Sequence, residues 1–272
     1  MSKVSIVLPY FNRKNLLYNT LESFSKFYRD ENIEVVIVDD GSSEDQRLEQ
    51  MVKKYPFDIN LIRIEGNNDV NPCYVYNVGV RHSVGDIIVL SSPETFHTSN
   101  MFKVTNNFKE LNDKTYLLLS VFCLTDPTLK LIMEDMNVDF DTKLNHIEGC
   151  RNAFYLNLGC HGYPFNNDYG SWYLHSIYRK SGLNFFSVLS RNLYNKISGF
   201  DERFRKGTGC DDEEFRVRVF EEVDDIFYYD ESVAIHVDHA LVREGNPISN
   251  SNLFKQTRKD KYQHNDKWGI IT

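Results

Sequence analysis

Side chains that could do chemistry gather at four places in this sequence of 272 residues. Asp39-Asp40 follows the apolar run IEVVIV, and Glu94 follows the run IIVL, so a carboxylate stands where each predicted strand ends. An acidic group runs from Asp211 to Glu214, and two histidines stand at His236 and His239. Carboxylates can accept a base N–H or a ribose hydroxyl, bind a hard cation or take up a proton, and imidazole can bind a metal.

Each of these groups also has a purely structural explanation. Asp39 and Asp40 could cap a helix that begins near residue 44, a contribution of about 1 kcal/mol. An exposed acidic run is most often a solvated helix face. Two histidines three residues apart on an extended segment can be polar surface. The residue types alone leave both explanations open.

Alternating strands and helices must position these groups. Strands are predicted at 4–8, in the apolar run of the segment 33–43, and at 59–64, 87–90 and 115–124, and helices at 13–29, 44–55, 72–84 and 99–111. This alternation predicts an α/β sheet with right-handed crossovers, and such sheets bind ligands at the carboxyl ends of their strands. Pro9 should end the first strand, because proline cannot donate to a ladder.

The pattern changes after residue 125. Residues 126–170 are rich in Asn, Asp, Gly and aromatic residues without a sustained period, and are predicted to be irregular. A helix near 171–180, a strand at 184–190, a helix opening at the acidic group, a strand near 226–236 and a polar tail from 244 complete the prediction. We expect one continuous domain.

Composition excludes several classes of protein. The net charge of −8 argues against nucleic-acid binding, which needs a basic face. No apolar run approaches the roughly 20 residues of a membrane span. Five cysteines without CxxC spacing indicate reduced thiols, and no signal peptide is predicted, so we expect a cytoplasmic protein. A phosphate loop GxxxxGK[ST] and a GxGxxG after the first strand are both missing, which argues against P-loop enzymes and dinucleotide dehydrogenases.

Four segments in a fixed order resemble the family 2 glycosyltransferases of the GT-A fold: VSIVLPYFNR, EVVIVDDGSS, YNVGVRHSVGDIIVL and KISGFDERFRKGTGCDDEEFRVR. The resemblance implies a Rossmann-like, mostly parallel central sheet flanked by helices, with a C-terminal acceptor-side subregion. It also implies an inverting transferase that moves a sugar from a nucleoside diphosphate sugar, often a UDP-sugar, to an acceptor hydroxyl of a glycan or glycoconjugate. Residues 1–125 would form the nucleotide-sugar-binding half, 126–243 the acceptor-binding and catalytic half, and 244–272 a C-terminal tail.

The resemblance also assigns the nucleotide end of the site. Pro9, Tyr10 and Phe11 match the loop that stacks the nucleobase, and an aromatic face suits a flat base. Core filling by either aromatic residue is the structural alternative. Asp40 matches the carboxylate that reads the base, with Asp39 supporting the turn.

The resemblance is imperfect at the diphosphate. Asn77 matches a helix that packs beneath the phosphates, but Tyr76 stands where the family often has arginine, so one positive charge is missing or comes from elsewhere. Ser92-Pro93-Glu94 aligns with the Asp-x-Asp that holds a divalent metal, and only one carboxylate remains there.

A rebuilt metal site is our interpretation of this departure. The resemblance places a metal-binding histidine here, which is His236 or His239, and with Glu94 it would bind Mn²⁺ or Mg²⁺; imidazole favours Mn²⁺. Ser92 would stay neutral. A metal-independent transferase stays open as the alternative.

In the family, the second residue of an acidic pair is the general base, which is Asp212 here. It would take the proton from the acceptor hydroxyl, a contribution of about 10²–10⁴-fold. Asp211 and Glu214 are predicted to bind the acceptor or to cap the helix. Trp172 and His175, with the loop 166–169, lie in the segment that shapes the acceptor pocket in such enzymes, with core packing as their structural alternative.

Two other classes of function remain. An inactive sugar-nucleotide-binding module is favoured by Ser92 and Tyr76 and opposed by the intact acidic group. A nucleotidyltransferase would need glycines after the first strand, which PYFNRKN lacks. The sequence predicts no transmembrane segment and leaves peripheral membrane association open.

Overall fold

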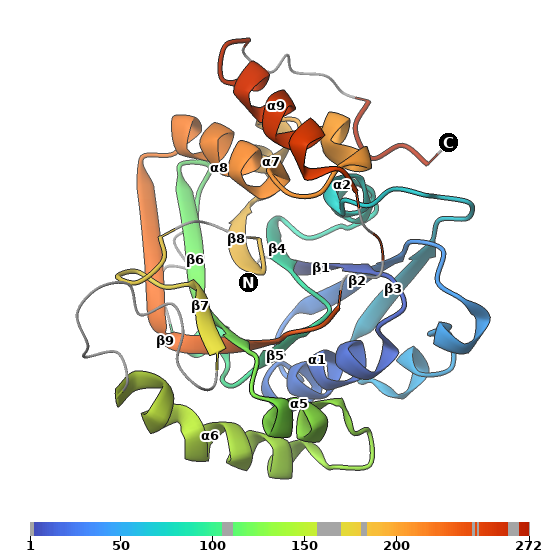
Figure 1. Cartoon of the computed structure of the whole chain (residues 1–272), viewed down its shortest axis with the longest axis vertical. Helices are drawn as coiled ribbons and strands as arrows, with labels where there is room; N and C mark the ends of the chain where they lie inside the picture. Colours follow the sequence, from blue (N-terminus) through green and yellow to red (C-terminus); the bar gives the residue numbers. More distant parts are fainter. Residues whose placement is uncertain are drawn as a thin grey trace.

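The computed structural model describes residues 3–104, 111–156, 170–180, 184–240, 243, 245–260 and 267–271, without the side chains of 104 and 151–156. Within these residues one sheet runs through the molecule, with α2, α7, α8 and α9 on one side and α1, α5 and α6 on the other (Figure 1). The helices are α1 (Lys14–Phe27), α2 (Cys73–Arg81), α3 (Met101–Val104), α5 (Pro127–Glu134), α6 (Phe140–Leu156), α7 (Arg191–Lys196), α8 (Asp211–Glu222) and α9 (Pro247–Thr257).

The described strands form a single sheet in the order β3-β2-β1-β4-β8-β6-β9-β5, with β7 paired to β6. β3, β2, β1 and β4 are parallel; β8 is antiparallel to β4 and β6; β9 is parallel to β6 and antiparallel to β5. The strands are β1 (Val4–Tyr10), β2 (Ile33–Asp39), β3 (Asp58–Arg63), β4 (Ile87–Ser91), β5 (Thr95–His97), β6 (Thr115–Leu124), β7 (Gly170–Leu174), β8 (Phe186–Ser190) and β9 (Asp225–Val237). The predicted α/β class is therefore confirmed.

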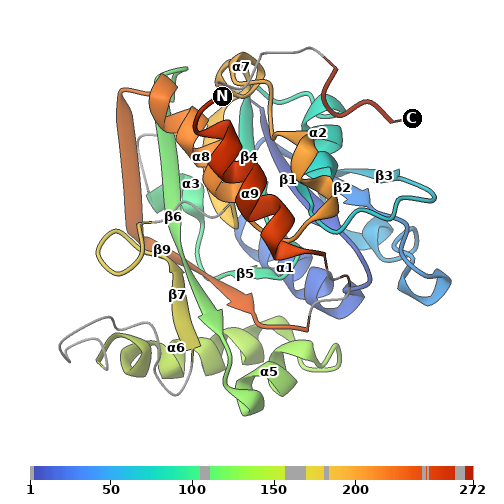
Figure 2. The same ribbon diagram turned by 45° about the horizontal axis from the view of Figure 1, so that its top comes forward.

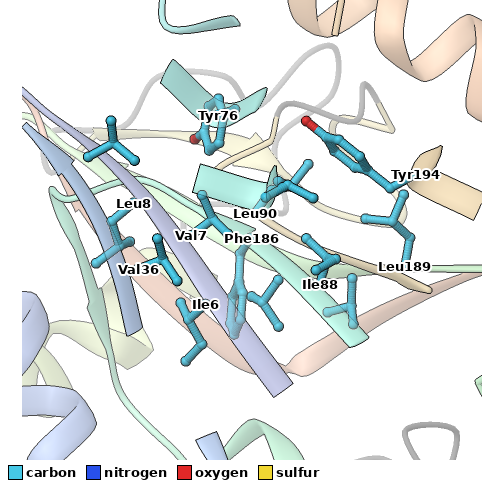
Figure 3. Packing of buried hydrophobic residues seen from close by; sticks show 14 of the residues in the cluster. Ile6, Val7, Leu8, Val36, Tyr76, Ile88, Leu90, Phe186, Leu189 and Tyr194 are labelled. Carbon is cyan, nitrogen blue, oxygen red and sulfur yellow. The ribbon is translucent and has the colours of Figure 1, made fainter. Parts of the chain in front are cut away.

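The core is built from the apolar runs that predicted these strands. All seven residues of β2 are buried, as a parallel strand covered on both faces requires. Figure 3 shows the apolar side chains of β1, β2, β4 and β8 packed against one another. This packing fixes the carboxyl ends of β1, β2 and β4 relative to one another.

Pro9 does not end β1, which continues to Tyr10. Pairing between β1 and β4 stops at Val7 and Leu90, so the missing N–H of Pro9 breaks no hydrogen bond on that side. On the other side Tyr10 accepts from the Asp40 N–H at 2.9 Å.

The predicted helix over 44–55 is wrong. The chain forms two 3₁₀ turns there, η1 (Glu44–Gln46) and η2 (Val52–Lys54). The Tyr10 hydroxyl donates to the Gln46 carbonyl at 2.7 Å, so that carbonyl is taken by a tertiary partner. No α-helix begins at residue 44, and Asp39 and Asp40 therefore cap none there.

Three segments of the second half also differ from the prediction. Residues 127–156 are largely helical, and Asp126 caps α5 by accepting from the Leu129 N–H at 2.8 Å. Residues 170–174 form β7, whose burial alternates as a strand requires, in place of the predicted helix. The tail contains α9, which packs along α8 (Figure 2). No helix of the described residues is both long enough and apolar enough to cross a lipid bilayer.

Candidate active site

A cavity of about 470 Å³ opens at the carboxyl ends of β1, β2 and β4 and the end of β9. The end of β1 and the loop after it contribute two aromatic residues, the loop after β2 contributes a carboxylate, and the segments that follow β4 and end β9 contribute a second carboxylate and two imidazoles. Eight of the predicted site residues line this cavity: Pro9, Tyr10, Phe11, Asp40, Ser92, Glu94, His236 and His239.

The turn after β2 separates the two adjacent aspartates. Gly41 adopts a φ of +78°, which favours glycine. Asp39 turns away from the cavity: it accepts from the Ser42 N–H at 2.9 Å and pairs with Arg63. Asp39 therefore holds the turn, while Asp40 lines the cavity.

Asp40 is buried and carries two side-chain partners. Asn67 donates to one carboxylate oxygen and Arg243 to the other. Burial raises the pKa of Asp40 to about 6, against the lowering effect of Asn67 and Arg243. The Arg243 guanidinium also lies 3.5 Å from the centre of the Phe11 ring. The expected nucleobase-binding residues are thus close together, with an arginine between them.

Glu94 lies on the connection from β4 to β5 and is buried. Ser92 orients it twice, since its hydroxyl donates to Glu94 Oε2 and accepts from the Glu94 N–H at 3.2 Å. Arg13 Nη1 donates to Glu94 Oε1 at 2.6 Å. Burial alone would raise the pKa of Glu94, but Arg13, His239 and His236 hold it below its usual value. Glu94 is therefore an ionised carboxylate.

The two histidines meet Glu94 because β5 pairs with β9. Thr95 stands opposite His236 in this ladder. One ligand atom from each of Glu94, His236 and His239 lies within 4.8 Å of the others. Burial lowers the pKa of His236 to about 4, so its imidazole is neutral and keeps a nitrogen lone pair. A carboxylate with two imidazole nitrogens suits a divalent transition metal.

Asp211 and Asp212 are the first two residues of α8 and do not line the cavity themselves. Asp212 accepts from the Asn184 side chain at 2.6 Å, and Asp211 accepts from Asn71, a lining residue, at 2.7 Å. Burial and the Asp211 carboxylate raise the pKa of Asp212. Tyr76 connects the cavity wall to Asn184, because it lines the cavity and donates to the Asn184 carbonyl at 3.2 Å.

Besides Asp39, Asp211 and Asp212, four further predicted residues do not line the cavity: Asn77, Glu214, Trp172 and His175. The Asn77 side chain is fully buried and bonded to Tyr194, Phe200 and Glu202, so it cannot contact a cofactor directly. Glu214 pairs with Arg218 and faces a different cavity beside α9. Trp172 belongs to a second core cluster, and the His175 ring packs against the Trp172 ring. The loop 166–169 lies outside the described residues.

Both arginines that line the cavity, Arg13 and Arg243, are among the lining residues that were not predicted. Arg13 lies soon after the end of the first predicted strand, so its position in the sequence could have indicated that it lies near the ligand-binding edge of the sheet. Arg243 lies in the region predicted as the tail boundary, where neither pattern nor spacing indicated a contact with Asp40, 203 residues earlier. These two arginines bring positive charge to a cavity whose sequence motif lacks an arginine at residue 76.

Both the sequence and the fold of this chain are similar to those of known glycosyltransferases. The family model "Glycosyl transferase family 2" matches residues 5–182. An uncharacterized glycosyltransferase, YfnE of Bacillus subtilis (strain 168), is 37% identical over 101 residues, 36% of this chain and 23% of that protein. The chain therefore matches well under two thirds of that relative's length.

Solved structures share the fold at low identity. S. aureus TarS 1-349 in complex with UDP-GlcNAc superposes with a TM-score of 0.56 at 15% identity, over 91% of this chain and 60% of that one. Mannosyltransferase PcManGT from Pyrobaculum calidifontis, in complex with GDP-Man and Mn²⁺, gives 0.50 at 17% identity, over 85% and 56%. The described chain thus has the mixed α/β architecture of GT-A proteins.

Proposed function

The chain belongs to glycosyl transferase family 2, and from that premise we propose that it is an inverting glycosyltransferase. Its donor would be a nucleoside diphosphate sugar, with UDP as the nucleotide, and its acceptor a hydroxyl of a glycan or glycoconjugate. The observation that carries the proposal is the meeting of Phe11 and Asp40 with Glu94, His236 and His239 in one cavity.

The nucleotide end of the cavity fits a flat, hydrogen-bonding ligand. The Phe11 ring supplies a face on which a base can stack. The Asp40 carboxylate beside it accepts a ring N–H. These two contacts would orient the donor so that its diphosphate points toward Glu94.

Glu94, His236 and His239 would hold a divalent ion, Mn²⁺ by ligand type. The ionised carboxylate and the neutral His236 imidazole fit this use, and the Ser92 hydroxyl donates to the Glu94 carboxylate and accepts from the Glu94 N–H. Such an ion stabilises the negative charge of the departing diphosphate.

Arg13 would supply the positive charge that the sequence lacks at Tyr76. Its side chain lines the cavity beside Glu94, and a guanidinium fork matches phosphate oxygens. Tyr76 cannot do this, because its hydroxyl is already bonded to the carbonyls of Ser91 and Asn184.

Asp212 would act as the general base. It takes the proton of the acceptor hydroxyl while that oxygen attacks the anomeric carbon, opposite the leaving diphosphate. Its raised pKa suits this role, since a more basic carboxylate accepts the proton more readily. Asn184 donates to Asp212 Oδ1 from its backbone and side-chain N–H groups, which orients the carboxylate.

Calorimetry with UDP, in the presence and absence of Mn²⁺, tests the donor assignment. We expect UDP to bind tightly only with Mn²⁺, and Glu94→Ala to remove that dependence. Equal UDP affinity with and without Mn²⁺, in both proteins, would reject the metal assignment. A metal-independent transferase or an inactive binding module, favoured by the neutral Ser92, would then be the better explanation, and release of UDP with an acceptor present separates those two.

A further inference from the structure

The Arg243 side chain lies in the part of the cavity assigned to the nucleobase. Its guanidinium is 3.5 Å from the centre of the Phe11 ring, which places the planar cation over the ring face. The same group donates to the carboxylate of Asp40. Phe11, Asp40 and Arg243 all line the main cavity.

Fixed backbone acceptors hold Arg243 in this position. Nη2 donates to the Asp40 carbonyl at 2.9 Å and to the Asn67 carbonyl at 3.2 Å, and Nη1 donates to the Asp69 carbonyl at 2.8 Å. These carbonyls lie on the turns that follow β2 and β3. Every partner of the guanidinium is therefore present before any ligand enters.

A nucleobase needs the same two partners that Arg243 uses. A base that stacks on Phe11 and donates a ring N–H to Asp40 presents a flat face and an N–H edge, and a guanidinium presents both. Asn67 already donates to the other Asp40 oxygen. Phe11 and Asp40 therefore cannot serve Arg243 and a base in the same way at once.

We propose that Arg243 is a built-in competitor of the nucleobase: it occupies the base subsite in the empty protein and must leave when the donor binds. This inference rests on the proposed function for the identity of the ligand, and it adds a residue that sets donor affinity. Binding of a nucleotide then includes the cost of releasing Arg243, so the measured affinity is lower than the affinity of the vacated subsite.

Calorimetric titration of UDP with Mn²⁺ into wild type, Arg243→Ala and Arg243→Lys tests this proposal. We expect Arg243→Ala to bind UDP about tenfold more tightly. If the state in which Arg243 occupies the base subsite is favoured about tenfold over the vacated state, it lowers the apparent UDP affinity by that factor. Arg243→Lys keeps the charge but loses the planar fork, so an intermediate gain is expected. It gives a second measurement in case Arg243→Ala folds poorly, which circular dichroism would detect.

The matched control is Arg81→Ala. Arg81 also lies over an aromatic ring, 4.7 Å from the centre of Trp268, but lines no part of the main cavity. Its replacement should leave UDP affinity unchanged. Unchanged or weaker UDP binding by both Arg243 variants, while wild type binds UDP, overturns the competitor role alone. If neither wild type nor the variants bind UDP or GDP, the proposed function fails and this inference fails with it.

Discussion

Replacing Arg13 with alanine should change metal affinity and nucleotide affinity in opposite directions. Arg13 Nη1 lies 2.6 Å from Glu94 Oε1, and the Glu94 carboxylate is buried. A metal ion that uses this oxygen must displace the guanidinium, which carries a like charge. Removing Arg13 therefore frees the carboxylate for the ion.

The size of the effect follows from this contact. A hydrogen bond between charged groups contributes about 1.5–3 kcal/mol, and the partial exposure of Arg13 places the value near the lower end. Since about 1.4 kcal/mol is a factor of ten, Arg13→Ala should bind Mn²⁺ roughly tenfold more tightly without nucleotide. With Mn²⁺ saturating, UDP should bind roughly tenfold more weakly, because the diphosphate loses a charged donor.

The assay measures both constants on the same protein. Electron paramagnetic resonance of free Mn²⁺ gives the metal affinity, and calorimetry gives the UDP affinity. Lys14→Ala is the control, because the Lys14 ammonium donates to the Asp45 carbonyl at an exposed site and lines no part of the cavity. An Arg13→Ala protein with wild-type Mn²⁺ affinity would refute the reasoning, since Arg13 and the metal would then not share Glu94.

Three further changes test the catalytic and the structural parts. Asp212→Asn should lower turnover by about 10²–10⁴-fold with UDP affinity unchanged. Because burial and Asp211 raise the pKa of Asp212, wild-type turnover should increase with pH above the usual titration range of a carboxylate. A rate that stays flat between about pH 5 and pH 9 would contradict this. Asn77→Ala should cost about 2–4 kcal/mol in urea denaturation, because buried partners lose their hydrogen bonds, whereas Asn60→Ala, which loses one exposed bond to a carbonyl, should cost less than about 0.5 kcal/mol. Burial lowers the pKa of Lys143 to about 8, so this lysine binds more protons in the unfolded chain between that pH and about 10.4, and its own contribution to stability increases with pH over this window. Buried thiols such as Cys73 and Cys123, whose pKa burial raises, contribute in the opposite direction. In the same urea assay, the stability of the wild type relative to Lys143→Met should therefore increase with pH over the window, and a constant difference would contradict this.

The sequence predicts the first half of the fold well because its signals are local. The run at 33–38 is apolar except for Glu34, and such a run is typical of a parallel strand covered on both faces. Asp40 and Glu94 follow such runs, so their meeting at one edge of the sheet could be predicted. The pairing of β5 with β9, which brings His236 to Glu94, agrees with the position that the family resemblance gave to the histidines.

The remaining features depend on contacts between distant residues. The carbonyl of Gln46 is taken by Tyr10, 36 residues earlier, and no local pattern reports that bond. Arg243 reaches Asp40 across most of the chain. The helix at 127–134 could have been predicted from a local signal, because Asp126 and Pro127 are a favourable N-cap and first helical residue. The prediction missed it because the segment was judged by its overall composition.

The ladder between β5 and β9 has a consequence for how this site can diverge. Thr95 stands opposite His236, so Glu94 and the imidazole share an edge only in this register. A shift of one residue would exchange His236 for Ile235 or Val237, whose side chains point to the opposite face. Insertions and deletions in either strand therefore erase the cluster, whereas single substitutions, such as the serine at residue 92, leave the backbone spacing intact. Point mutations can therefore change the ligand side chains one at a time, whereas the register of β5 and β9 must stay the same for any cluster to form at this edge.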